Sequence, residues 1–164
     1  MVERETISIT VDDKSFKFFL KPNIQEELRM RSEIAFLLGG VEKLSEFDIS
    51  IARAFDRHLE KQKKIFGEKV LKEKQAELRK LADDKDNLES FAKLFNELHG
   101  DDDYLVFSTL QREYEMISDY AFLKVMCVEK PENYDFYTQS ESELRQIVFA
   151  VRAQRDEYKK KSKN

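Results

Sequence analysis

Apolar and polar positions alternate over residues 6–11 and again over residues 15–20, a pattern that is typical of β-strands. The inward-facing sets of this alternation are Ile7, Ile9 and Val11, followed by Phe16, Phe18 and Leu20. β-Branched and aromatic residues favour the extended backbone, and the polar residues 12–15 between the sets are compatible with a turn. We therefore predict a β-hairpin over residues 6–20. Because one hairpin is only marginally stable alone, its apolar face must pack on helices or pair with another chain.

From Pro22 onwards the apolar spacing changes to that of a helix. Asn23 is a suitable N-cap, and Glu26 stands three residues later, as in a capping box. A helix over residues 24–38 would then end at Gly39-Gly40, since glycine readily adopts the left-handed conformation at a helix C-terminus. Its predicted apolar stripe is Ile24, Leu28, Ala35 and Leu38.

A long helical region follows, and its second half is densely charged. Residues 56–87 carry ten basic and eight acidic side chains, and the apolar spacing weakens along them. Gly67 lies inside this region and lowers its helix propensity by about 1 kcal/mol relative to Ala. We interpret residues 56–87 as a solvated helical stretch that projects from the core, and a break is expected at residues 83–87.

A short helix is predicted over residues 88–98, and a long one over 104–128 after the acidic run Asp101–Asp103. Negative charge is favourable at the positive end of a helix dipole. The long helix is apolar on two faces, which is typical of a buried position in a bundle. One face carries Phe107, Leu110, Tyr114, Ile117, Ala121 and Val125. The opposite face carries Leu105, Met116, Tyr120, Leu123 and Cys127.

Residues 129–135 are expected to connect this helix to a last one over residues 141–158. Ser140 and Glu143 have the spacing of a capping box. The apolar stripe of the last helix is Leu144, Ile147, Val148, Val151 and Tyr158. Phe149 falls well away from this stripe, among charged side chains. We expect residues 159–164 to form a frayed basic tail.

Composition favours a mainly α protein over a β-sandwich or barrel. Only four Gly and two Pro occur in 164 residues, too few for the frequent tight turns of those folds. We predict a helical bundle with an N-terminal β-hairpin, in a single domain over residues 1–164. The single cysteine and the absence of a long apolar run favour a cytoplasmic protein. The net charge of −4 gives no general attraction to nucleic acid.

The side chains that commonly carry chemistry do not form a recognisable catalytic, metal or cofactor motif. His58 is interpreted as a surface residue, and His99 as a protonated ring at a helix C-terminus. Asp101–Asp103 lack the spacing and the glycine of a calcium loop, so we assign them to helix capping. Cys127 has no basic neighbour on its own helix face and is interpreted as a buried, inert thiol. Convergence of distant residues leaves enzymatic activity open as an alternative.

The candidate functional residues are therefore those that could bind a protein partner. They are Phe149, Leu105, Met116, Tyr120 and Leu123. Phe149 is either a lone exposed apolar residue or an aromatic anchor for another chain. The other four lie on the second face of the long helix, which is either core or a partner site.

The order of these segments resembles the tail assembly chaperones of tailed bacteriophages. The resemblance is carried by an edge of the type Phe-x-Phe-x-x-Pro, matched loosely by residues 16–22, and by a connector Pro-x-x-Tyr-Asp at residues 131–135. It covers the two ends of the chain, about 60 residues. The charged stretch 56–87 is longer than this family suggests, and we interpret it as an insertion.

The resemblance implies binding without catalysis. Such chaperones coat the long helical tape measure protein until tail tube subunits polymerise around it, so either protein is an expected partner in the host cytoplasm. Some are also made in a longer, frameshifted form. The alternatives are a structural virion subunit of the tail or the head–tail connector, and a small regulator of a host protein. Self-association is compatible with each of them.

Overall fold

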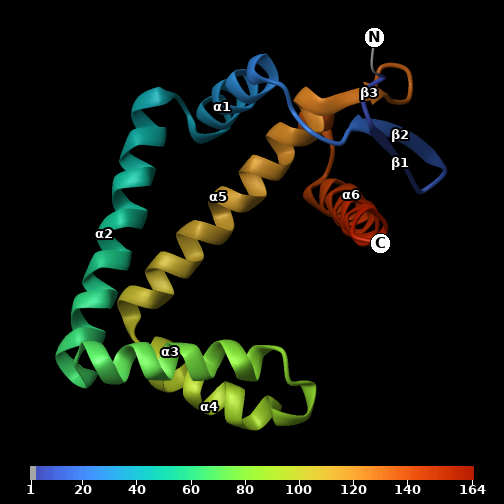
Figure 1. The fold of residues 1–164 in the computed structure, drawn as a ribbon. Coiled ribbons are helices and arrows are strands. Elements are labelled where there is room, and N and C mark those ends of the chain that lie inside the picture. The colour runs from blue at the N-terminus through green and yellow to red at the C-terminus, as the bar shows by residue number, and fades with distance from the viewer. Residues whose placement is uncertain (1–2) are drawn as a thin grey trace. The chain divides into compact units, whose positions relative to one another are not determined.

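The computed structural model describes residues 3–164, and its fold is mainly α (Figure 1). Within these residues, six α-helices accompany one three-stranded antiparallel sheet near the N-terminus, which confirms the predicted helical bundle with an N-terminal hairpin. The strands are β1 (Thr6–Val11), β2 (Lys14–Phe19) and β3 (Cys127–Glu129). The helices are α1 (Ile24–Leu38), α2 (Val41–Phe66), α3 (Glu68–Ala82), α4 (Leu88–His99), α5 (Asp102–Met126) and α6 (Glu141–Ser162), with short 3-10 turns at Lys85–Asn87 and Phe136–Thr138.

The chain forms two compact units. Unit 1 contains residues 1–44 and 114–164, and unit 2 contains residues 45–113. Unit 2 is thus inserted into the sequence of unit 1, and α2 and α5 each contribute residues to both units.

The hairpin of unit 1 has a two-residue turn. Asp12 and Asp13 have φ values of 47° and 63°, the left-handed conformation that a turn of the I′ type requires at both central positions. Aspartate tolerates this conformation better than most residues other than glycine. Opposite pairs in the register are Ile7 with Phe18 and Ile9 with Phe16, so one face of the hairpin is apolar.

The third strand, β3, was not predicted from the sequence. The long helix ends at Met126, two residues earlier than expected, and Lys17 of β2 pairs with Glu129. This pairing gives the sheet the order β1-β2-β3 and fixes the end of α5 against the hairpin.

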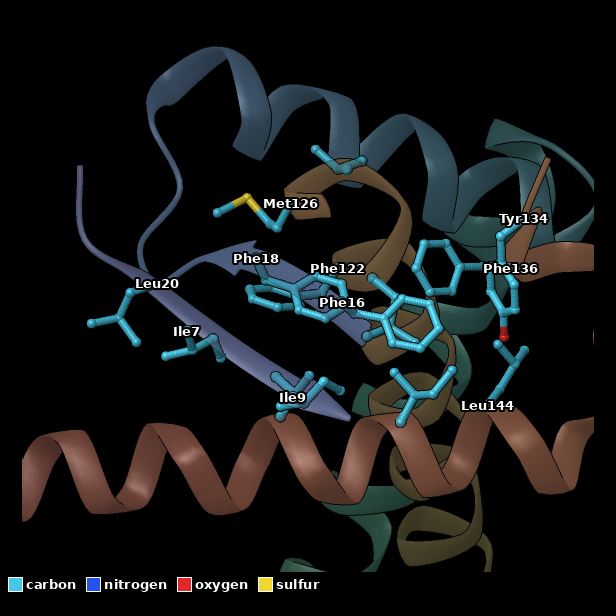
Figure 2. Close-up of a cluster of buried hydrophobic side chains, with 14 residues drawn as sticks. Ile7, Ile9, Phe16, Phe18, Leu20, Phe122, Met126, Tyr134, Phe136 and Leu144 are labelled. Atoms are coloured by element: carbon cyan, nitrogen blue, oxygen red, sulfur yellow. The ribbon is translucent and has the colours of Figure 1, made fainter. Parts of the chain in front are cut away.

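The core of unit 1 is aromatic and is built around the apolar face of the hairpin (Figure 2). The ring centroids of Phe16 and Tyr134 lie 5.0 Å apart, and those of Phe18 and Phe122 lie 6.3 Å apart. Phe136 contacts both hairpin rings. α6 packs along β1 and contributes Leu144, Ile147 and Val151. In the predicted stripe of the last helix, Leu144, Ile147 and Val151 are buried, and Val148 and Tyr158 are partly buried. The role of Tyr134 and Phe136 in the core was missed.

α1 has the predicted bounds and caps. Asn23 Oδ1 accepts a hydrogen bond from the Glu26 amide at 2.8 Å, and the Asn23 amide donates to Glu26 Oε2 at 2.9 Å. Gly39, with φ of 100°, ends the helix in the left-handed conformation. The predicted stripe is wrong at its start, because Ile24 and Leu28 are exposed.

Polar contacts attach both ends of α1 to the rest of unit 1. The Arg4 guanidinium donates two hydrogen bonds to the Glu26 carboxylate, at 2.8 and 2.7 Å, and lies 3.8 Å from the centre of the Phe19 ring. At the other end of α1, the Tyr137 hydroxyl donates to Glu33 Oε2 at 2.9 Å. These contacts take the place of the missing stripe at the first turns of the helix.

In unit 2, α3 and α4 form a helical hairpin around a small apolar cluster. Its buried residues are Leu71, Leu94 and Leu98, and partly buried neighbours include Leu59, Phe66, Leu78 and Leu81. The charged positions of residues 56–87 are largely exposed, as expected. The stretch is nevertheless not one projecting helix, because Gly67 breaks it and its leucines pack on α4.

The predicted frayed tail is also wrong in extent. α6 continues to Ser162, and the lysines at 159–161 are exposed on its last turn. Positive charge at a helix C-terminus interacts favourably with the dipole, which accounts for the extension.

Phe18 provides a test of the aromatic core. Its side chain is 0% exposed, so Phe18→Ala should lower the free energy of unfolding by about 3–5 kcal/mol, measured by urea denaturation. Ser15→Ala, at an exposed position on the same strand, should change it by less than about 0.5 kcal/mol. A loss below about 1 kcal/mol for Phe18→Ala would contradict a core role.

Gly67 provides a test of the break between α2 and α3. Its φ of 75° and ψ of 160° belong to a region that is essentially restricted to glycine. An added Cβ would meet no atom within 4 Å, so Gly67→Ala should cost about 1–3 kcal/mol through backbone strain alone. Urea denaturation followed by helical circular dichroism measures this cost, with Lys69→Ala as an exposed control. A more stable Gly67→Ala protein would mean that α2 and α3 can fuse into one helix.

Candidate partner-binding surface

The candidate surface of unit 1 is set by the way α6 packs. Ser140 caps the helix by accepting a hydrogen bond from the Glu143 amide at 3.2 Å. The Glu143 carboxylate pairs with Lys14 of the hairpin, so it does not complete the predicted capping box. With Leu144 and Ile147 buried against the sheet, the flank of α6 that carries Arg145 and Phe149 faces solvent.

Arg145 joins this flank of α6 to the C-terminal part of α5. Its guanidinium donates a hydrogen bond to Glu141 Oε1 at 2.7 Å, and Nη2 lies 3.8 Å from Met116 Sδ. Met116 and Tyr120 are one turn apart on α5, and both are half-buried. Burial raises the pKa of the Tyr120 phenol, so its hydroxyl stays protonated at neutral pH.

Phe149 is the most exposed member of this group, with 67% of its side chain accessible. It lies one helical turn after Arg145 and borders an open surface hollow that is also lined by Glu141, Ser142 and Gln146. We call Met116, Tyr120, Arg145 and Phe149 the α5–α6 surface. Aromatic, methionine and arginine side chains are enriched at protein interfaces, so this composition suits protein binding.

The remaining two candidate residues do not belong to the α5–α6 surface. Leu123 is 1% exposed and lies in the core of unit 1, so it is unavailable to a partner in the folded protein. Leu105 is 64% exposed but belongs to unit 2. The prediction that the long helix is buried on two faces holds only for its last turns, where Ala121, Phe122, Leu123, Val125 and Met126 are buried.

The most important group that was not recognised in the sequence lies in unit 2. His58 is 3% exposed, so its interpretation as a surface residue was wrong. Its Nδ1 lies 2.9 Å from both carboxylate oxygens of Asp101, and its Nε2 lies 3.2 Å from His99 Nδ1. Ala54, His58 and Gln62 are all buried, and their spacing of four residues could have indicated a common inward face.

The assignment of Asp101 to helix capping is confirmed. Its Oδ1 accepts a hydrogen bond from the Tyr104 amide at 3.0 Å, at the start of α5. His99 does end α4, but burial and the neighbouring His58 lower its pKa. The lower pKa favours the neutral ring, in contrast to the protonated ring that we expected.

The other chemically interesting side chains are not gathered into a site, and Cys127, which we expected to be buried, is half-buried. Burial raises the pKa of the Cys127 thiol, which reduces its thiolate fraction, and its Sγ lies 3.4 Å from the Glu129 carbonyl oxygen. Among residues 3–164, no three His, Cys, Asp or Glu side chains are placed to hold a metal ion. In the same part of the chain, no helix is both long and apolar enough to cross a membrane.

Compared with known proteins, the chain matches no family model, no curated protein and no solved structure.

Leu123 and Leu105 form a matched pair of leucines on one helix. Leu123→Asp should unfold unit 1, because an unpaired carboxylate in its core costs several kcal/mol. Leu105→Asp should leave the thermal melt within a few degrees of wild type, because that side chain is already in contact with water. Circular dichroism melts of both variants measure the difference. Normal folding of Leu123→Asp would show that this face is a partner site after all.

Proposed function

We propose that this chain is a non-catalytic protein-binding protein, acting as a tail assembly chaperone of a tailed bacteriophage. The observation that supports binding is the α5–α6 surface, where Phe149 stands clear of the buried stripe of α6, one turn after the Arg145 that contacts Met116. An aromatic side chain of this kind can fill a pocket on a partner and contribute a large share of the binding energy.

The proposed partner is an elongated helical protein of the tape measure type. Apolar residues of an amphipathic helix can cover Phe149 and Met116, while Arg145 and Glu141 at the margin can exchange hydrogen bonds with polar residues. The dense charge of α2 and α3 would keep the protein soluble while a long apolar client is bound. The tail tube protein is the second proposed partner.

The function is tested by binding to the tape measure protein that is encoded with this chain. The full chain is co-expressed with a helical fragment of that protein, and the affinity of the purified pair is measured by calorimetry. We expect a soluble complex, and an insoluble fragment with no measurable binding would contradict the proposal. Mass spectrometry of purified phage particles distinguishes a chaperone from the alternative, a structural virion subunit. The subunit remains in the particles, and the chaperone does not.

Phe149→Ser tests which surface is used. We expect the thermal melt to stay within a few degrees of wild type, because Phe149 is exposed, and binding to weaken at least about tenfold. Gln146→Ser, at an exposed polar position of the same hollow, serves as the matched control and should bind as wild type does. A large drop in melting temperature would place Phe149 in a core, and unchanged affinity would exclude it from the interface.

A further inference from the structure

Unit 2 contains a chain of three ionisable groups at the corner between α4 and α5. Asp101 contacts Nδ1 of the buried His58, and His58 Nε2 contacts His99 Nδ1. Asp101 is also the residue that caps the start of α5. The three groups therefore join α2, the end of α4 and the first turn of α5.

The number of protons in this chain of groups is set by its geometry. The Asp101 carboxylate accepts, so His58 Nδ1 carries a hydrogen. In a neutral His58 ring Nε2 is then an acceptor, and His99 Nδ1 must donate to it. Either ring can bind one additional proton, because a single N–H then still lies between His58 Nε2 and His99 Nδ1, and one of these nitrogens donates to the other. A second additional proton places two N–H groups and two cations against each other at 3.2 Å.

The surroundings do not compensate a doubly charged pair. The rings of Phe95 and Tyr104 pack on His99, with centroid distances of 5.0 and 4.2 Å, and leave it half-buried. The charged and titratable groups that pair or couple around this corner include Arg57 and Lys61 on α2, Lys74 on α3, Glu97 on α4, and Asp101, Asp102, Asp103 and Tyr104 at the start of α5. Asp103 is already paired with Arg57 and Lys61, and Glu97 with Lys74, and Asp101 is the carboxylate in contact with the imidazole pair.

We propose that His58 and His99 form a pH-sensitive lock that holds the corner between α4 and α5 on α2 and opens when both rings are protonated. Opening separates the two rings and withdraws Asp101 from the first turn of α5. The first two turns of α5 carry the exposed residues Leu105 and Val106, so the lock controls the order of an apolar segment.

The direction of the pH dependence follows from His99. Its pKa in the folded protein is below the ordinary value of 6.5, so between that lowered value and 6.5 the unfolded chain binds more protons than the folded one. The contribution of neutral His99 to folding stability is complete above pH 6.5, and it is lost as the pH falls from 6.5 through the lowered pKa of His99. The pKa of Asp101 is also lowered, from 3.8, so its own contribution is lost only at more acidic pH.

The lock can be tested on the unmodified full chain by NMR and hydrogen exchange. Long-range proton–nitrogen spectra identify the protonated nitrogens of both rings between pH 8 and 4.5. We expect His58 Nδ1 and His99 Nδ1 to carry hydrogen at high pH, and the protection of the Tyr104 amide to fall at least about tenfold, after correction for intrinsic exchange, as the second proton binds.

His99→Gln removes the second proton while its side-chain amide can still donate to His58 Nε2. In this variant the protection of the Tyr104 amide should change less than about twofold between pH 7.5 and 5.5. Lys93→Gln, at an exposed position of the same helix, is the control and should keep the wild-type pH dependence. The wild-type spectra remain decisive if His99→Gln does not fold.

Two results would overturn the lock. One is protonation of both rings near pH 6.5 with no loss of protection at Tyr104, because the pair would then titrate without restraint. The other is an equal loss of protection in wild type and His99→Gln, since the carboxylates would then be responsible. Both outcomes are independent of partner binding at the α5–α6 surface.

Discussion

The burial of two phenylalanines on one strand is the constraint on which unit 1 depends. A two-stranded hairpin is marginal in water, and Phe16 and Phe18 can leave the solvent only if other segments cover them. The cover comes from α5, from the connector with Tyr134 and Phe136, and from α6. These segments are far from the hairpin in sequence, so the sheet, the end of α5 and the start of α6 are all fixed by this one apolar face.

The parts of the fold that were predictable are those that local sequence specifies. Asn23 with Glu26 and the glycine at 39 defined α1 to the residue, because caps act within a few positions of each other. The apolar stripe of α6 was equally predictable, because its apolar residues recur at the spacing of one helix face. The position of Phe149 outside that stripe followed from the same helical geometry, and its exposure agrees with it.

The parts that were missed depend on distant partners. β3 is only three residues long, and Cys127 and Glu129 pair with a strand more than a hundred residues away. Tyr134 and Phe136 lie in a segment without regular periodicity, so nothing local marks them as buried. Ile24 and Leu28 show the opposite error, because an apolar spacing indicates a face but not whether another segment covers it. His58 was misjudged because a histidine in a charged helix gives no sign of Asp101 and His99.

The insertion of unit 2 into unit 1 has a consequence for synthesis on the ribosome. About a hundred residues separate Phe18 from Phe122, and α6 follows later still. At a translation rate of about 5–20 residues per second, the hairpin emerges roughly 5–20 seconds before these partners. Unit 2, whose α3–α4 hairpin is local in sequence, can fold during that interval. The nascent chain therefore carries an uncovered aromatic face for seconds, next to a highly charged segment that opposes aggregation.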